Sequence, residues 1–528
     1  MNDYRTDKLK ITAAVLAFWL IFVLCGTTYG LGISKAMPVQ KIASKDILLK
    51  LENNSNIIYD NVEIDGDLNF SNSNQTQSGH FINSKINITK IISITNSIFT
   101  GKISLKNCNL LDGANFKGSD FRGLADFSNS RFSKKANFLG CDFEIGCDFS
   151  GAVFLNQLVF KNAIFGGDVT FENSVQQDTS LFYNSSFKEK ANMRNSTYLT
   201  DVYFTYAKFN DSVDFSRAKL RKADFMSSRF IGDPILLLNA TFYDGTSFGG
   251  TTFRKEPIFY GSEFLGNTKF DQTQFDEGAS FKVDTFDGNV IFDESVFAKD
   301  AKFNGALFNG TVGFNASQFN ANALFDGAKF KGRLYLKGAK YDKLYVRWSD
   351  LHDLDYDDSA YLLIIENFKK LGFFSDADEC YYHYRNTGRQ YLPLQYRPVD
   401  FLLMALYGYG TKPEFPLGWS VFFIIACGLF FYATNGVQKG LSGSDGGRGE
   451  NDQSMRGSQE NQGPQRLSLW EAINFSATAF TSGASAFISY PPGFKPVSKS
   501  SYLVTLERIF GWVLFTLFLT ALARTVIR

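Results

Sequence analysis

The sequence predicts a mainly β protein, a solenoid of short stacked strands (a β-helix), together with a C-terminal α-helical membrane domain. Phenylalanine recurs every 11 residues from about residue 116 to about residue 336, and a second phenylalanine series runs five residues behind the first. Three apolar stretches lie outside this repeat. A fixed short period marks a repeat protein in which each unit buries its apolar face only against its neighbours.

The two series together place large apolar residues at alternating steps of five and six. The first series comprises Phe116, Phe127, Phe138, Phe149, Phe160, Phe171, Phe182, Met193, Phe204, Phe215, Met226, Leu237, Phe248, Phe259, Phe270, Phe281, Phe292, Phe303, Phe314, Phe325 and Leu336. The second comprises Phe121, Phe132, Phe143, Phe154 and Phe165, and later Phe242, Phe253, Phe264, Phe275, Phe286, Phe297, Phe308, Phe319 and Phe330.

Neither a helix nor one flat strand accommodates these steps. At about 100° per residue, helical steps of five and six turn by about 140° and about 240°, which leaves no single apolar stripe to bury. Strand side chains alternate with period two, so both steps cannot stay on one face. The segment is also rich in Gly, Asn, Asp and Ser, which favour turns. Short strands joined by corners satisfy the spacing.

A small residue two positions before most of these phenylalanines supports the β-helix. Residues at i and i−2 of a strand point the same way, and a narrow coil has room for one large and one small group per face. Cys141 and Cys147 occupy this small position and are predicted to be buried. The other small residues include Ala114, Ala125, Ser130, Ala136, Ala152, Ala163, Ala207, Ala223, Ala240, Ala301, Ala306, Ala323 and Ala328.

The repeat resembles the Phe-rich form of the pentapeptide-repeat family. Ala125-Asp126-Phe127 with Phe132, and Ala136-Asn137-Phe138 with Phe143, match that family's small-polar-large unit. The resemblance implies a right-handed parallel β-helix with a quadrilateral cross-section. The chain departs from the family because every second unit has six residues, so four faces would make a coil of about 22 residues at a spacing of about 4.8 Å.

One irregularity interrupts the repeat. The register slips by one residue near Phe225 and Phe230 and recovers by Phe242. We therefore expect a bulge or a bent coil around Ile231–Leu238.

The patterns divide the chain into seven segments. We expect an N-terminal transmembrane segment or signal anchor at 1–43, a β-rich cap at 44–115, the pentapeptide-repeat β-helix at 116–340, a helical cap and amphipathic segment at 341–415, a transmembrane helix at 416–437, a disordered linker at 438–467, and a pore-helix-like element with the last transmembrane helix at 468–528. The apolar stretches are Ile11–Ile33, Pro416–Val437 and Ile509–Ala523. The first is either a cleaved signal peptide or an anchor, and the last needs snorkelling arginines to span a bilayer.

Composition excludes several classes of function. A formal net charge of +1, with both signs interleaved along the repeat, argues against a nucleic-acid partner. No Walker A, G-x-G-x-x-G, HExxH or CxxC motif is present, and the three histidines lie far apart in sequence. We therefore expect no catalytic residue, no metal ligand and no cofactor. N-x-S/T sequons are frequent, and they favour an exported repeat; they begin at Asn53, Asn69, Asn74, Asn87, Asn184, Asn195, Asn210, Asn239, Asn309 and Asn315.

Three helical elements are expected directly after the repeat. Ser359–Leu371 reads as a helix closed by Gly372, and Ser375 as the cap of a second helix that ends near Tyr384. This pair is either one hairpin of the tetratricopeptide type or a plain helical cap on the last coil. Arg397–Gly410 is amphipathic and suited to lie along a membrane surface.

The last segment resembles the pore module of two-span potassium-channel-like proteins. Ser468 and Glu471 form a capping box for a short helix, Leu469–Phe480, which leads through a small-residue loop to the last span. The loop in the place of the ion filter is Thr481, Ser482, Gly483, Ala484, Ser485, Ala486 and Phe487. Its second filter glycine is missing, so potassium selectivity does not follow. A packed helix pair without conduction is the alternative.

Two functions are compatible with these features. The first is a non-catalytic, membrane-anchored scaffold whose repeat binds an unknown protein or surface ligand. The second is an ion channel or channel-derived sensor, a homo-oligomer (a tetramer if it conducts) regulated by the repeat. Membrane lipid is a partner in both. The basic residues flanking the spans do not decide the topology, and the basic N-terminus and the sequons favour an extracytoplasmic repeat in a multi-pass cell-membrane protein.

Overall fold

The computed structural model describes residues 40–72, 86–439, 466–482, 493–497 and 499–526. The chain divides into two compact units. The first is the solenoid, which extends to Tyr335 and includes Ala339–Asp342; the second comprises Leu336–Gly338 and the residues from Lys343 onward. The first predicted apolar stretch, Ile11–Ile33, lies outside the described residues.

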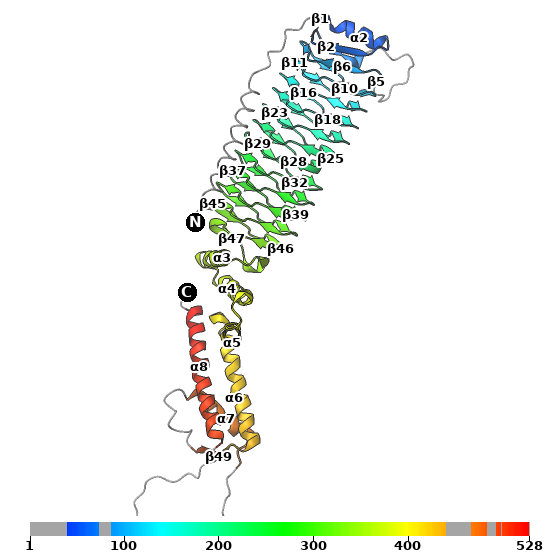
Figure 1. The fold of residues 1–528 in the computed structure, drawn as a ribbon. Helices are drawn as coiled ribbons and strands as arrows, with labels where there is room; N and C mark the ends of the chain where they lie inside the picture. The colour runs from blue at the N-terminus through cyan, green and yellow to red at the C-terminus, as the bar shows by residue number, and fades with distance from the viewer. Residues whose placement is uncertain (1–39, 73–85, 440–465, 483–492, 498, 527–528) are drawn as a thin grey trace, which may run out of the picture. The chain divides into compact units, whose positions relative to one another are not determined.

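Each regular turn of the solenoid contains four short strands. One turn comprises β10 (Ala114–Asn115), β11 (Asp120–Phe121), β12 (Ala125–Asp126) and β13 (Arg131–Phe132). The next strand, β14 (Ala136–Asn137), pairs in parallel with β10, with Ala114 opposite Ala136, so a turn takes 22 residues. Four parallel ladders built in this way run through about 14 turns (Figure 1). The predicted parallel, four-sided β-helix is confirmed.

Phenylalanine rings fill the interior in stacked columns. Phe121 and Phe143, at the same position of successive turns, have ring centroids 4.7 Å apart and planes 3° apart. Across the turn, Phe116 and Phe127 meet edge to face at 6.0 Å. These rings are fully buried, and both geometries are the ones that the aromatic quadrupole favours. The predicted stacking of Phe on Phe is confirmed.

The small inward residues complete this core. Cys141 and Cys147 are buried free thiols, as predicted. At several of these positions a serine hydroxyl donates to a buried carbonyl, as Ser130 Oγ does to Phe127 O at 2.6 Å, whereas the buried Ser180 Oγ has no such partner. Larger aliphatic residues also occupy this position in some turns, as the buried Leu158, Val169 and Ile235 show.

The solenoid begins before the phenylalanine series does. β1 (Gln40–Ala43) pairs with β3 (Val62–Asp65), which pairs with β7 (Ile98–Phe99), and β7 pairs with β11. The segment predicted as a cap thus contributes turns with isoleucine cores. Helix α2 (Ser44–Glu52) buries Ile47 and Leu51 and packs against β1, β2 (Ile57–Asp60) and β4 (Leu68–Asn69). Helix α2 therefore covers the first turn of the solenoid.

One turn of the solenoid is irregular, as the slipped repeat predicts. Between β25 (Thr197–Tyr203) and β28 (Lys219–Asp224), Tyr198 lies opposite Leu220, but Val202 lies opposite Ala223. One residue is therefore missing from the corner at Arg221–Lys222. Register returns at β30 (Ile235–Leu236), where Ile235 lies opposite Val213. The shift begins about ten residues before the predicted Ile231–Leu238, which contains the compensating extra residue.

The last strands of the repeat are followed by a helical hairpin. The strands are β45 (Gln318–Leu324), β46 (Lys329–Tyr335), β47 (Lys340–Tyr345) and β48 (Leu351–Leu354), and the helices are α3 (Asp358–Lys370) and α4 (Phe374–Gly388). Gly372 has the positive φ of a helix terminator, as predicted. The predicted Ser375 cap is wrong, because Ser375 lies inside the first turn of α4, whose N-cap is Phe373.

The remaining elements form the C-terminal part of the second unit. They are α5 (Arg397–Tyr407), the 3-10 turn η4 (Gly408–Gly410), α6 (Glu414–Thr434), β49 (Val437–Lys439), α7 (Leu469–Thr481), β50 (Phe494–Pro496) and α8 (Ser500–Val526). α6, and α8 as far as Arg524, are long and apolar enough to cross a membrane, and few of their residues are buried.

Candidate functional site

The three C-terminal helices form a compact bundle. β49, directly after α6, pairs antiparallel with β50, directly before α8, so the end of α6 lies beside the start of α8. Helix α7 begins at this same end, where Glu471 forms a 2.7 Å ion pair with Lys439. The predicted capping box is present, with reciprocal bonds between Ser468 and Glu471. Figure 1 shows α7 beside α6 and α8 at the end marked by β49.

Helix α7 runs back along the bundle and ends partway along α8. Phe475 of α7 packs on Phe431 of α6. The next residue of α7, Ser476, donates to the carbonyl of Ile424, which comes before Phe431 in α6. Helices α7 and α6 are therefore antiparallel. The end of α7 reaches Gly511, in the middle of α8. Helix α7 therefore begins at one end of the bundle and ends near the middle of α8.

Two glycines allow the helices to approach closely. A Cβ atom on Gly428 of α6 would lie 2.8 Å from Cα of Ile473, and one on Gly511 of α8 would lie 2.1 Å from the carbonyl oxygen of Phe480. Neither distance is compatible with a side chain. Small residues at helix contacts are typical of helix association in membranes, where close backbone approach supplies the packing energy.

A buried carboxyl group lies inside this bundle. Glu507 of α8 is 2% exposed and contacts the hydroxyl of Ser476 on α7. Ser476 therefore joins α7 to both of the long helices. An ionisable residue at such a position is rare in membrane segments and is a default candidate for function.

The predicted pore loop is only partly described. Thr481 ends α7, and its hydroxyl donates to Ala477 O at 2.7 Å; Ser482 donates likewise to Ala479 O at 2.7 Å. Both hydroxyls satisfy carbonyls at the end of the helix. The other five residues of the loop, Gly483, Ala484, Ser485, Ala486 and Phe487, lie outside the described residues, so the filter stays a prediction.

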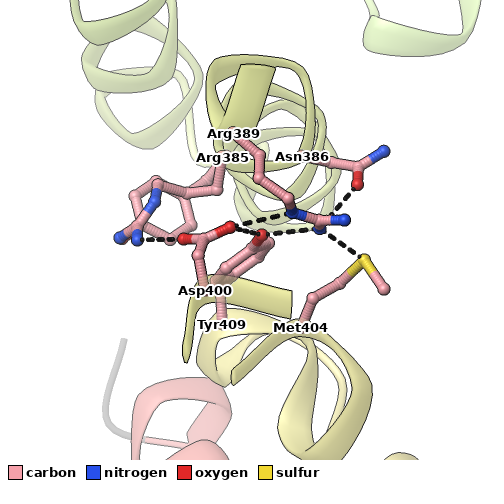
Figure 2. A network of polar contacts seen from close by, with 7 residues as sticks. Arg385, Asn386, Arg389, Asp400, Met404 and Tyr409 are labelled. Carbon is pink, nitrogen blue, oxygen red and sulfur yellow. Dashed lines mark hydrogen bonds and ion pairs between the residues drawn. The ribbon is translucent and has the colours of Figure 1, made fainter. Parts of the chain in front are cut away.

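A second polar site lies between α4, α5 and η4, and is termed here the Asp400 cluster: Arg385, Asn386, Arg389, Asp400, Met404 and Tyr409 (Figure 2). Asp400 accepts from Arg385 at 2.9 Å, from Arg389 Nε at 3.0 Å and from the Tyr409 hydroxyl at 2.6 Å. Arg389 Nη2 also donates to Tyr409 Oη at 2.9 Å and to Asn386 Oδ1 at 2.9 Å. Each donor on one element thus has an acceptor on another.

Burial and hydrogen bonding act in opposite directions on the pKa of Asp400. Asp400 is 4% exposed. Burial by itself would raise the pKa of Asp400, but the hydrogen bonds from Tyr409, Arg389 and Arg385 outweigh it, and the pKa lies below its usual value. Burial and the neighbouring carboxylate raise the pKa of Tyr409 to about 12. The cluster therefore holds one ionised carboxylate between two guanidinium groups at neutral pH.

Further ion pairs join the same region to the long helices. Arg524, near the end of α8, lies 3.5 Å from Asp378 of α4 and donates to the backbone carbonyl of Tyr409 at 3.4 Å. Lys412, just before α6, forms a 2.6 Å ion pair with Glu379 of α4. Helix α4 thus contacts the start of α6 and the end of α8.

Sequence reasoning did not identify Asp400, Arg385, Arg389 or Glu507. One signal was available for Asp400, which is the only acidic residue in the predicted amphipathic segment Arg397–Gly410. Its partners come from α4, from the 3-10 turn η3 (Arg389–Tyr391) and from η4, and pairing across elements of this kind has no local sequence pattern. Among the described residues, no group of three His, Cys, Asp or Glu side chains is arranged to hold a metal ion.

The surface of the solenoid is hollowed at its irregular turn. This open depression of about 500 Å³ is lined by Thr197, Tyr198, Leu199, Lys219, Arg221, Tyr243 and Asp244. It lies at the shortened corner, where Arg221 and Asp244 form a 3.1 Å ion pair.

The family model for pentapeptide repeats, described as nine copies, matches residues 94–142, 127–181, 259–307 and 292–340. The solenoid is a pentapeptide-repeat domain. The two unmatched stretches of this domain are its isoleucine turns and the region around the irregular turn, where the spacing departs from the repeat. The match does not reach the C-terminal bundle, whose resemblance to two-span channels stays a prediction. No curated protein and no solved structure matches the chain.

Proposed function

We propose that the protein is a membrane-anchored scaffold, in which α6 and α8 cross the bilayer and the pentapeptide-repeat domain presents a binding surface. The outward side chains of α6 and α8 carry this proposal, because large apolar groups are exposed along both helices. They are Leu417, Val421, Phe422, Ile425, Leu429 and Phe430 on α6, and Leu506, Ile509, Phe510, Trp512, Phe515 and Leu519 on α8. In water such surfaces would cause aggregation, whereas in a bilayer they contact the acyl chains.

Extraction of membranes from expressing cells tests the anchor. The full-length protein is expected to stay in the membrane pellet after an alkaline carbonate wash and to be released by detergent. A variant with Phe422→Lys and Ile425→Lys on α6 would place two charges at the bilayer core, where each costs about 3 kcal/mol. It is expected to insert poorly. Release of the unaltered protein by carbonate alone would overturn the proposal.

A second candidate function, ion conduction by an oligomer, is favoured by the position of α7. The C-terminal end of α7 lies near Gly511, in the middle of α8, and in two-span channels the filter follows a short helix of this kind. The loop Thr481–Phe487 is then the candidate filter, and four copies would complete the pore. Because the second filter glycine is missing, we propose no selectivity for potassium.

Flux through the purified protein in liposomes tests conduction. Gly483→Pro alters the backbone of the loop and is expected to abolish flux, whereas the matched Gly440→Pro, in the linker, is expected to leave flux unchanged. Equal flux from both variants would show that the loop does not line a pore. If an assembled oligomer shows no flux, conduction is excluded and the scaffold remains as the proposed function.

The membrane side of the pentapeptide-repeat domain stays a proposal. If α6 and α8 span, the domain lies on the side where α6 begins, since no candidate span separates Lys343 from Glu414 among the described residues. We retain the extracytoplasmic side as the proposed one. A cysteine at the exposed Tyr260 is expected to react with an impermeant maleimide on intact cells; reaction only after lysis would place the domain inside.

A further inference from the structure

Helix α5 has its polarity reversed relative to a helix in water. Its acidic residue, Asp400, faces the protein in the Asp400 cluster (Figure 2). The residues on the opposite arc, Val399, Phe401 and Leu402, are all more than half exposed. A surface helix in water shows the opposite arrangement, with apolar residues inward and charges outward. This face of α5 is therefore suited to apolar surroundings.

The segment that precedes α5 has the same character and is held rigidly. Tyr391, Leu394 and Tyr396 are exposed. Arg397 donates to the carbonyls of Leu392 at 2.9 Å and Gln390 at 2.6 Å, which fixes the loop against the start of the helix. The exposed apolar groups thus belong to a loop that is held by hydrogen bonds. Together with those of α5 they form one surface, termed here the α5 face: Tyr391, Leu394, Tyr396, Val399, Phe401 and Leu402.

The position of α5 along the chain sets its depth. Helix α6 has 21 residues, which at 1.5 Å each is about the thickness of a bilayer's hydrocarbon core. If α6 spans, its first turn lies at the boundary between acyl chains and headgroups. α5 ends seven residues before α6 begins, and Trp419 in the first turns of α6 donates its indole N–H to Ala405 O of α5 at 2.7 Å. The α5 face is thereby continuous with the exposed surface of α6 that begins at Leu417.

Resting on the membrane anchor proposed above, we infer that residues 391–407 form an interfacial membrane segment, whose α5 face inserts into the boundary between acyl chains and headgroups. Tyrosine and tryptophan concentrate at this depth because one end of each ring is apolar and the other forms hydrogen bonds; Tyr391, Tyr396 and Trp419 lie here. The Asp400 cluster forms the dry, protein-facing side of the segment and ties it to α4. The occupant of the α5 face is thus the bilayer itself.

Spin labels on the full-length protein in phospholipid vesicles test this inference. Labels are placed one at a time at Leu402, Leu394, Ile425 and Leu362, in a background without Cys25 and Cys427; the other four cysteines are buried. Leu362, on α3, is a matched control, because it is 54% exposed and Leu402 is 55% exposed. Collision rates with oxygen, which enters lipid, and with a water-soluble nickel chelate report the depth of each label.

Labels at 402 and 394 are expected to collide more often with oxygen than with the nickel chelate, which would place them at a depth between the labels at 425 and 362. If the labels at 402 and 394 match 362 while 425 is deep in lipid, the anchor holds and the interfacial segment is wrong. If 402 and 394 are shielded from both reagents, protein covers the α5 face, and the inference is again wrong. If 425 itself is aqueous, the proposed membrane anchor fails.

Discussion

Asparagine residues at the corners of the solenoid adopt the left-handed conformation that the corners require. Asn162, Asn184 and Asn195 have φ between 52° and 57°, a region that asparagine and glycine tolerate best. Asn184 Nδ2 also donates to Asn162 Oδ1, one turn earlier, at 3.0 Å. The next residue is the small inward one, here Ser185 and Ser196. Corner conformation thus explains the asparagines at which the sequons Asn184 and Asn195 begin, whereas their third residues, Ser186 and Thr197, start the next strands.

One inward position holds a carboxyl group instead of a small neutral residue. Asp284 stands where Ser262 stands one turn earlier and Ala306 one turn later, and it is fully buried. It accepts from Ser262 N–H at 2.7 Å. Burial raises the pKa of Asp284 well above its usual value, an effect that hydrogen bonds from the backbone of Ser262 and Gly261 only partly offset.

Asp284→Ala is therefore expected to stabilise the solenoid at neutral pH, by about 1–3 kcal/mol for one buried polar group. In the unfolded chain the carboxyl ionises near pH 4, whereas the folded chain retains the proton to higher pH, so stability falls as pH rises from about 4 toward the folded pKa. The gain from the substitution should appear in denaturant unfolding at about pH 8 and disappear near pH 4. The exposed Asp287→Ala serves as control, and a gain independent of pH would contradict the explanation.

At the scale of the element, the stability of the solenoid depends on the continuity of each column of rings. Phe270 stacks between Phe248 and Phe292, with centroid distances of 4.8 Å on both sides. Phe270→Ala is expected to cost about 3–5 kcal/mol of unfolding free energy, because it removes ring area on both sides and leaves a cavity. Phe270→Leu, which copies the natural Leu237, should cost about 1.5 kcal/mol. Equal losses in denaturant unfolding would show that shape, and not buried volume, governs the column.

Helix α7 packs against α8 through a backbone contact that one methyl group would block. Gly511→Val is expected to displace α7 from α8 and to destabilise the bundle by about 1–3 kcal/mol or more, since a Cβ would overlap Phe480 O. Gly418→Val on α6 is the matched control, because no atom lies within 4 Å of its Cβ position. Thermal unfolding in detergent should separate the two variants. If both behave as the unaltered protein does, α7 does not pack against α8 at this point.

At the scale of the whole molecule, the Asp400 cluster and its neighbouring ion pairs connect the helical hairpin to the two long apolar helices, α6 and α8. Asp400→Asn removes the negative charge that pairs with Arg385 and Arg389 and is expected to cost about 3–5 kcal/mol, as for other buried ion pairs that lose one partner. Glu379→Gln, which breaks the more exposed pair with Lys412, should cost about 1 kcal/mol or less. Limited proteolysis between α4 and α5 would measure both effects, and equal rates for the two variants would contradict the central role of Asp400.

The same cluster predicts a response to acid. Because the pKa of Asp400 is lowered on folding, its stabilisation is fully present above about pH 4, the pKa of an unfolded Asp, and is lost as pH falls through the lower, folded value. Proteolysis between α4 and α5, with a protease active in acid, should therefore accelerate below about pH 4 in the unaltered protein. Asp400→Asn should be cleaved quickly at every pH. An unaltered protein that shows no acceleration in acid would contradict this account.

The sequence by itself determined the solenoid, its coil length, its stacked rings and the position of its irregular turn, because a repeat protein buries each unit only against its neighbours and local spacing therefore specifies the contacts. It also determined the helix starts with a local cap, such as Ser468 with Glu471. Only the tertiary structure decided which side of α5 is polar, which residues surround Asp400, and that α7 runs back between α6 and α8. Those contacts join residues far apart in the chain, and their energy comes from burial and ion pairing that exist only after the helices have packed.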